Sequence, residues 1–222
     1  MRVVAVAALV AAVGIFATPA PADDGPLART REVLEASSAI VKGAGDRKEK
    51  LTALGDLLRD YLDTEALAQL AAGKHLEGRS EAEVKEFLSL FHEFFVRTYT
   101  QRLLLFDAPD FAYGAEKVDG DSARVATEVV TQGDRFAVDY ALKRSPNGWR
   151  AVDIVVEGVS LAGNFRSQFD AAVAKDSFQG LLDRLRAMVS APPASSWTSC
   201  GRSSGRTCGS SSATAARCSS RW

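Results

Sequence analysis

Residues 135–169 decide the fold; they read RFAVDYALKRSPNGWRAVDIVVEGVSLAGNFRSQF. The first part alternates between apolar and other side chains, the period of two that gives a strand one apolar face. Its apolar positions are Phe136, Val138, Tyr140 and Leu142. The next residues, SPNG at 145–148, predict a turn, because Pro fixes φ and Asn-Gly accepts the left-handed angles of a tight hairpin.

A second strand is predicted from Trp149, with Val152, Ile154 and Val156 on one face. Glu157 and Gly158 end this strand. Ser160 is a suitable N-cap for a helix that holds Phe165 and Phe169 on one side. The stretch therefore predicts two antiparallel strands followed by an aromatic helix.

The same period of two extends back to Phe111. Turn signals at 119–120, 133–134 and 146–148 separate four runs of strand length, which predicts a four-stranded antiparallel meander. Two helices are expected after the sheet, over residues 161–175 and 178–189.

Helical periods precede the sheet. Helices are expected over residues 27–41, after the cap Asp46, and over residues 64–72. A longer helix begins at the capping box of residues 80–83, and Pro109 ends the pattern. The sequence thus predicts an α+β fold, in which N-terminal helices and a long amphipathic helix pack on a curved, mainly antiparallel sheet with C-terminal helices.

Composition and the N-terminus indicate an exported globular protein. The chain of 222 residues is 46% hydrophobic and 25% charged, and its net charge of -1 does not favour nucleic acid as a partner. Residues 1–22 read as a secretory signal peptide, with one Arg, an apolar run and a small-residue cleavage site near Ala22. An uncleaved membrane anchor is the alternative. The predicted location is the periplasm.

One domain is predicted over residues 23–190. Residues 191–222 differ in kind: they are rich in Ser, Arg and Gly, with few aliphatic residues, and we interpret them as a disordered tail or as out-of-frame translation. The three cysteines, Cys200, Cys208 and Cys218, all lie there. They do not form a zinc pattern, and neither a metal nor a cofactor is predicted.

Candidate catalytic groups are few. His92 is most simply a structural histidine; alternatively it is a general base beside Asp139 or Asp153, in an enzyme that acts on a small molecule. The sequence contains no phosphate-binding glycine loop, nucleophile elbow or His-x-x-x-His pattern. We therefore predict no catalytic residues.

The long helix has an unusually aromatic face. Its apolar and aromatic positions are Val84, Phe87, Leu88, Phe91, Phe94, Phe95, Tyr99, Leu103 and Phe106. Such a face usually fills a solid core, as in an interaction subunit without a ligand. The alternative is an apolar cavity for acyl chains, with Arg97, Arg102 and Arg166 near its mouth.

The quoted stretch resembles the MlaC family of periplasmic phospholipid-binding proteins, also called toluene-tolerance or ABC-transporter auxiliary proteins. The resemblance rests on Val138-Asp139-Tyr140, Trp149 with Asp153, residues 157–161 (EGVSL) and residues 164–169 (NFRSQF). Residues 63–75 (DTEALAQLAAGKH) and 91–99 (FHEFFVRTY) are also similar. It extends over about residues 27–189.

The resemblance implies an NTF2-like α+β fold with a deep apolar cavity and no catalysis. It also implies a carrier that shuttles phospholipid between an outer-membrane lipoprotein complex and an inner-membrane ABC transporter, and so maintains outer-membrane asymmetry. A hopanoid cargo remains open. We expect the lipid to contact twelve residues: Phe91, Phe94, Phe95, Tyr99, Leu103, Phe106, Val138, Tyr140, Ile154, Val156, Phe165 and Phe169.

Overall fold

The computed structural model describes residues 25–105, 109–131 and 134–191. The predicted signal peptide, Phe106 and the tail from residue 192 onward lie outside these residues. The described elements are α1 (Pro26–Lys42), α2 (Arg47–Tyr61), α3 (Thr64–Ala72), the short 3-10 helix η1 (Gly73–Leu76), α4 (Glu81–Leu103), β1 (Asp110–Asp119), β2 (Ser122–Thr131), β3 (Asp134–Ser145), β4 (Gly148–Val156), β5 (Val159–Ser160) and α5 (Leu161–Ser190).

The strands form one antiparallel sheet in the order β1-β2-β3-β4-β5. The predicted meander is confirmed, and β5 adds a two-residue edge strand to it. Glu157 and Gly158 join β4 to β5 with φ of 50° and 77°. Positive φ at both central residues is the geometry of a tight hairpin whose twist matches that of its strands.

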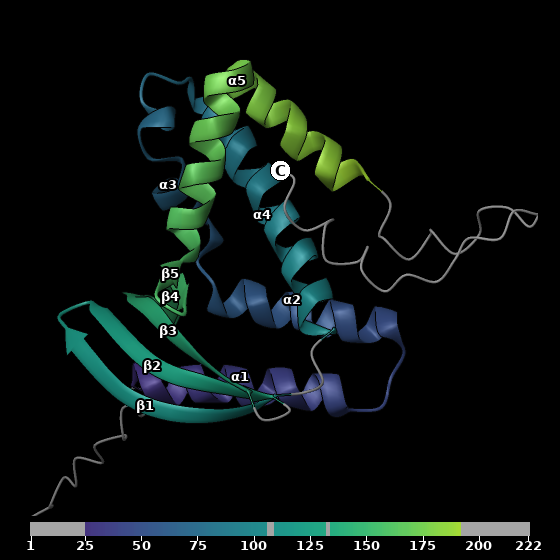
Figure 1. Ribbon diagram of the computed structural model, residues 1–222, viewed down its shortest axis with the longest axis vertical. Coiled ribbons are helices and arrows are strands. Elements are labelled where there is room, and N and C mark those ends of the chain that lie inside the picture. Colours follow the sequence, from purple (N-terminus) through teal and green to yellow (C-terminus); the bar gives the residue numbers. More distant parts are fainter. Residues whose placement is uncertain (1–24, 106–108, 132–133, 192–222) are drawn as a thin grey trace, which may run out of the picture.

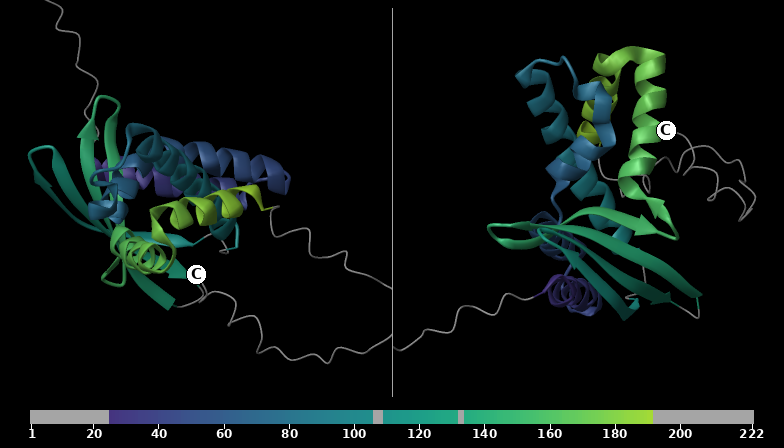
Figure 2. Two further views of the ribbon diagram at one scale, coloured as in Figure 1. Left: turned by 90° about the horizontal axis from the view of Figure 1, so that it is seen from above. Right: turned by 90° about the vertical axis from the view of Figure 1, so that its left-hand side faces the viewer.

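The sheet curves around α1 (Figures 1 and 2). Two irregularities in register contribute to the curvature: one in β1 between Tyr113 and Glu116, and one in β4, where Val152 has no partner on β3. The second bulge changes the predicted alternation of β4, because Val152 no longer shares one regular face with Ile154 and Val156. Helix α1, from the start of the chain, covers the concave side of the sheet.

A second layer of α3, α4 and α5 stands on one end of the sheet (Figure 1). Ser80 and Glu83 form the predicted capping box of α4. That helix ends at Leu103, earlier than the aromatic pattern suggested. The two predicted C-terminal helices form α5, which is interrupted at Ser177, where φ is 69°. Among the described residues, no helix is both long and apolar enough to cross a membrane.

The core between these helices is aromatic and solid. Phe87 and Phe91 on α4 meet Phe165 and Phe169 on α5 edge to face, with ring centroids 5.2–6.0 Å apart. Phe178, just after the interruption of α5, also packs on Phe87. These side chains are almost fully buried, and edge-to-face contacts suit the quadrupoles of their rings.

Polar contacts fix the junction between the sheet and the helical layer. The carboxylate of Asp153 accepts hydrogen bonds from the Ser160 hydroxyl (2.5 Å) and the Ala162 amide (3.0 Å), which holds the start of α5 against β4. The amide of Asp63 donates to the carbonyl of Ala151 (2.8 Å), which joins the α2–α3 connection to the same strand. The start of α5 and the α2–α3 connection are therefore both joined to the sheet at β4.

Candidate functional site

The site lies where α1 crosses the concave face of the sheet. The first half of α1 is held by contacts with α2 and β1. The Leu27 amide donates to the Glu116 carboxylate (2.8 Å), and the Arg31 guanidinium lies over the ring of Tyr113 (4.4 Å). The Thr30 and Tyr61 hydroxyls lie 2.8 Å apart, and Arg29 pairs with Asp60. The four residues of α1 that are fully buried, Pro26, Thr30, Val33 and Leu34, also belong to this half. The second half of α1 is less tightly packed.

Beneath that second half lies a cavity of about 360 Å³, which we call the outer cavity. Its walls come from α1, the end of α4 and four strands of the sheet. The lining residues are Leu34, Ser37, Ser38, Val41, Leu103, Pro109, Phe111, Val129, Phe136, Val138, Tyr140 and Val156. Among the described residues that line it, Tyr140 is the only one with an ionisable side chain. Phe136 and Val156 are 39% and 44% exposed, so they mark the point where the cavity meets the surface.

A smaller space of about 110 Å³, the inner chamber, lies toward α2 and the middle of α4. It is lined by Val33, Leu34, Ser37, Leu57, Leu58, Tyr61, Leu62, Phe95, Tyr99, Leu103, Tyr140 and Ile154. Leu34, Ser37, Leu103 and Tyr140 line both spaces. We call these four residues the neck, because the two spaces adjoin across them.

Two hydroxyl groups beside the neck, those of Tyr61 and Ser37, have hydrogen-bond partners within the protein. Burial raises the pKa of both Tyr61 and Tyr140, so both phenols stay neutral. The Tyr61 hydroxyl pairs with Thr30, and the Ser37 hydroxyl donates to the Leu34 carbonyl (2.7 Å). Because these two groups are bonded within the protein and most of the other lining side chains are apolar, the chamber is suited to an apolar occupant.

The structure separates the twelve predicted contact residues into groups. Leu103, Val138, Tyr140 and Val156 line the outer cavity, and Phe95, Tyr99, Leu103, Tyr140 and Ile154 line the inner chamber. Phe91, Phe94, Phe165 and Phe169 line neither space and pack on one another in the solid aromatic core. Phe106 lies outside the described residues. Contact with a ligand stays a prediction for all twelve.

Sequence reasoning missed the contribution of α1. Leu34, Ser37, Ser38 and Val41 form one wall of the outer cavity, opposite Phe111, Val129 and Phe136 on the sheet. The period of two in the strands was the available signal for the sheet residues. For α1 the signal was Ser37-Ser38, two small residues between apolar positions, which leave space where a larger side chain would fill it.

The structure does not bring the candidate catalytic residues together. His92 lies 2.6 Å from the Thr64 hydroxyl through Nδ1, in a polar cleft with Asp63, Glu65 and Arg150 that neither Asp139 nor Asp153 lines. A carboxylate oxygen of Asp139 lies 3.5 Å from a guanidinium nitrogen of Arg124. Asp153 accepts hydrogen bonds from Ser160, the N-cap of α5, and from the Ala162 amide. Within the described part of the chain, no group of three or more His, Cys, Asp or Glu residues is placed to hold a metal ion.

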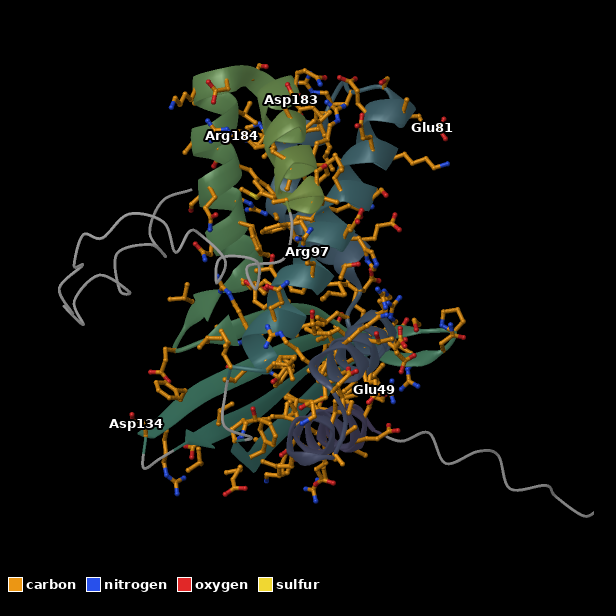
Figure 3. All side chains as sticks on the ribbon, turned by 90° about the vertical axis from the view of Figure 1, so that its right-hand side faces the viewer. Glu49, Glu81, Arg97, Asp134, Asp183 and Arg184 are labelled. Carbon is orange, nitrogen blue, oxygen red and sulfur yellow. The ribbon has the colours of Figure 1, made fainter. Side chains whose placement is uncertain are left out.

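The three arginines suggested for the mouth do not line either space. Arg97 on α4 donates to the carbonyls of Val189 and Ala191, so it holds the end of α5 (Figure 3). Arg166 donates to the Leu70 carbonyl, and Arg102 lies over the ring of Tyr99 (5.3 Å). Arg97 and Arg166 thus have structural partners in the helical layer.

Comparison with known proteins gives two findings. The model of the family described as MlaC protein matches residues 29–187, which is most of the chain. The fold is similar to that of the phospholipid-binding protein from Ralstonia solanacearum, whose structure was solved in complex with a phospholipid. That similarity has a TM-score of 0.64 at 22% sequence identity, and it covers 73% of this chain and 96% of the solved one.

Proposed function

We propose that this chain, which belongs to the MlaC protein family, binds a phospholipid by its acyl chains in the cavity beneath α1. The single observation that supports this most strongly is the outer cavity itself: about 360 Å³, lined by apolar side chains and meeting the surface at Phe136 and Val156. Such a volume is within the range of roughly 300–1,000 Å³ that is usual for small-molecule sites. The phospholipid in the similar Ralstonia structure supports the same cargo.

The chemistry of the lining explains how binding would be driven. Each buried methylene contributes about 0.8 kcal/mol, so about ten of them contribute roughly 8 kcal/mol, comparable to a micromolar dissociation constant. Association costs reduce this gain. Since no Arg or Lys of the described residues lines the cavity, the head group would remain at the surface, outside the Phe136–Val156 rim.

We further propose that the protein is exported and works as a carrier in the periplasm, between an outer-membrane lipoprotein complex and an inner-membrane ABC transporter. The signal-peptide pattern of residues 1–22 supports export. Withdrawing acyl chains into water is unfavourable, so release would need a surface that covers the mouth, either a membrane or a partner protein.

Lipid exchange tests the proposal. Donor vesicles hold a self-quenched fluorescent phosphatidylglycerol, acceptor vesicles hold none, and the purified protein is added to the mixture. We expect the initial rate of the fluorescence increase to be proportional to the protein concentration. A protein that accelerates exchange of a hopanoid but not of phosphatidylglycerol would shift the cargo to polycyclic lipids. No acceleration with either lipid would contradict unassisted carriage, and direct binding would then be measured separately.

A further inference from the structure

The site is divided, and its two parts are unequal. The inner chamber, at about 110 Å³, has less than a third of the 360 Å³ of the outer cavity. Phe95 and Tyr99 stack with their ring centroids 4.2 Å apart and form part of its wall. A second part of the wall is Tyr61, whose ring lies 5.9 Å from that of Tyr140 in the neck. The chamber is too small for a complete acyl chain.

We infer that the neck separates the outer cavity from the inner chamber, and that the inner chamber accepts the methyl end of one acyl chain, which makes it the part of the site that selects lipids by chain length. This inference rests on the proposed function. A short chain ends in the outer cavity. A longer chain passes the neck and places its last methylene groups in the chamber.

The bonding around the chamber supports an apolar chain end as its occupant. The hydroxyls of Tyr61 and Ser37 already have partners, on Thr30 and on the Leu34 carbonyl. A head group would find no charged partner among the described lining residues, which include no Asp, Glu, Lys, Arg or His. Flexible methylene chains also fit a constricted passage better than a rigid polycyclic ring system does.

Two substitutions fill the chamber without replacing a neck residue, although Ile154 pairs with Tyr140 of the neck across β3 and β4. Leu58 on α2 and Ile154 on β4 line the inner chamber but not the outer cavity, and both are half-buried. Leu58→Phe and Ile154→Phe each add volume there from a different element. Leu51→Phe is the matched control, since Leu51 is a half-buried leucine of the same helix that lines neither space.

The experiment is a competition. Each protein is incubated with vesicles holding equal amounts of dimyristoyl and distearoyl phosphatidylglycerol, and native mass spectrometry gives the ratio of the two bound masses. Both lipids share one head group and one vesicle, so the difference between variants reports the protein alone. Thermal unfolding of each variant identifies a variant that has not folded, and the other chamber-filling variant then decides.

We expect the ratio of long to short lipid to fall by about tenfold in Leu58→Phe and Ile154→Phe, because about two methylenes per lipid lose their burial, and to stay unchanged in Leu51→Phe. An equal ratio in all four proteins would overturn the inference and leave the proposed function standing. If the unsubstituted protein bound neither lipid, the proposed function would fail, and the inference with it.

Discussion

The hydroxyl oxygen of Thr30 lies 2.8 Å from that of Tyr61, in a buried pair that joins α1 to α2 beside the inner chamber. Thr30 also donates to the Pro26 carbonyl (2.7 Å), so it keeps a partner when Tyr61 is changed. The Tyr61 hydroxyl has no second hydrogen-bond partner among the described residues. The two side chains therefore do not contribute equally to stability.

This asymmetry predicts an order of stabilities. Tyr61→Phe should lower the free energy of unfolding by about 1 kcal/mol, and Thr30→Val by about 1–3 kcal/mol, because it leaves a buried phenol without a partner. The double variant should lose less stability than the sum of the two single losses, because both substitutions remove the same hydrogen bond. Urea unfolding of the four proteins measures this, and strictly additive losses would show that the pair is not coupled.

The aromatic core and the cavity rim should respond differently to truncation. Phe91 is fully buried among Phe87, Phe95 and Phe165, so Phe91→Ala should lower the free energy of unfolding by about 3–5 kcal/mol. Phe136 is 39% exposed at the rim. Phe136→Ala should therefore lower the free energy of unfolding by about 0.5 kcal/mol or less, and weaken lipid binding instead. Denaturant unfolding and lipid binding are measured on both variants; equal stability losses would contradict the division into core and rim.

A charge at the rim should impair binding without unfolding the protein. Val156→Asp places a carboxylate where a bound acyl chain would remove it from water, so we expect lipid binding to weaken by about 10-fold to 100-fold. Val118→Asp is the control, because Val118 is similarly exposed, at 47% against 44%, and does not line the cavity. A loss of binding in both variants would indicate a general effect of added charge.

The pH dependence of stability should include a contribution from His92. Burial, with the charge of Arg59 as a smaller cause, lowers the pKa of His92 in the folded protein below its ordinary value of 6.5. The unfolded chain then binds more protons than the folded one around this pH, so the free energy of unfolding falls as the pH decreases below about 7.

His92→Gln removes this titration. We expect the melting temperature of the unsubstituted protein, relative to that of His92→Gln, to decrease between pH 7.5 and pH 5.5 (about two units spanning the ordinary histidine pKa). Thermal unfolding at several pH values tests the sign. A relative melting temperature that rises as the pH falls would show that the folded state instead favours the imidazolium.

Much of the fold follows from local patterns. The alternation in residues 136–142, the SPNG turn and the capping box at Ser80 depend on neighbours in sequence, and the structure contains the strand, the turn and the cap that they predicted. The interruption of α5 at Ser177 likewise matches the gap between the two predicted helices. The bulge at Val152 was not predicted, because the apolar alternation of β4 contains no local signal for it; β4 contacts α2, α3 and α5 as well as β3.

The site was predicted only in part, for a physical reason. A helical period shows which face of α4 is buried but not what covers it, and α5 covers Phe91 directly with Phe165 and Phe169. The hollow lies elsewhere, under Ser37 and Ser38, where α1 crosses the sheet. Cavities arise from the distance between elements and from small side chains, and neither produces a periodic signal in the sequence.

The most direct test of the central claim is native mass spectrometry of the protein, expressed from its full-length gene, exported by a bacterial host and recovered without detergent. We predict a bound mass that corresponds to a diacyl phospholipid, released when the complex is activated in the gas phase. A folded protein that carries no lipid, and that takes up none from phosphatidylglycerol or phosphatidylethanolamine vesicles, would contradict the proposal that the cavity beneath α1 is a phospholipid site.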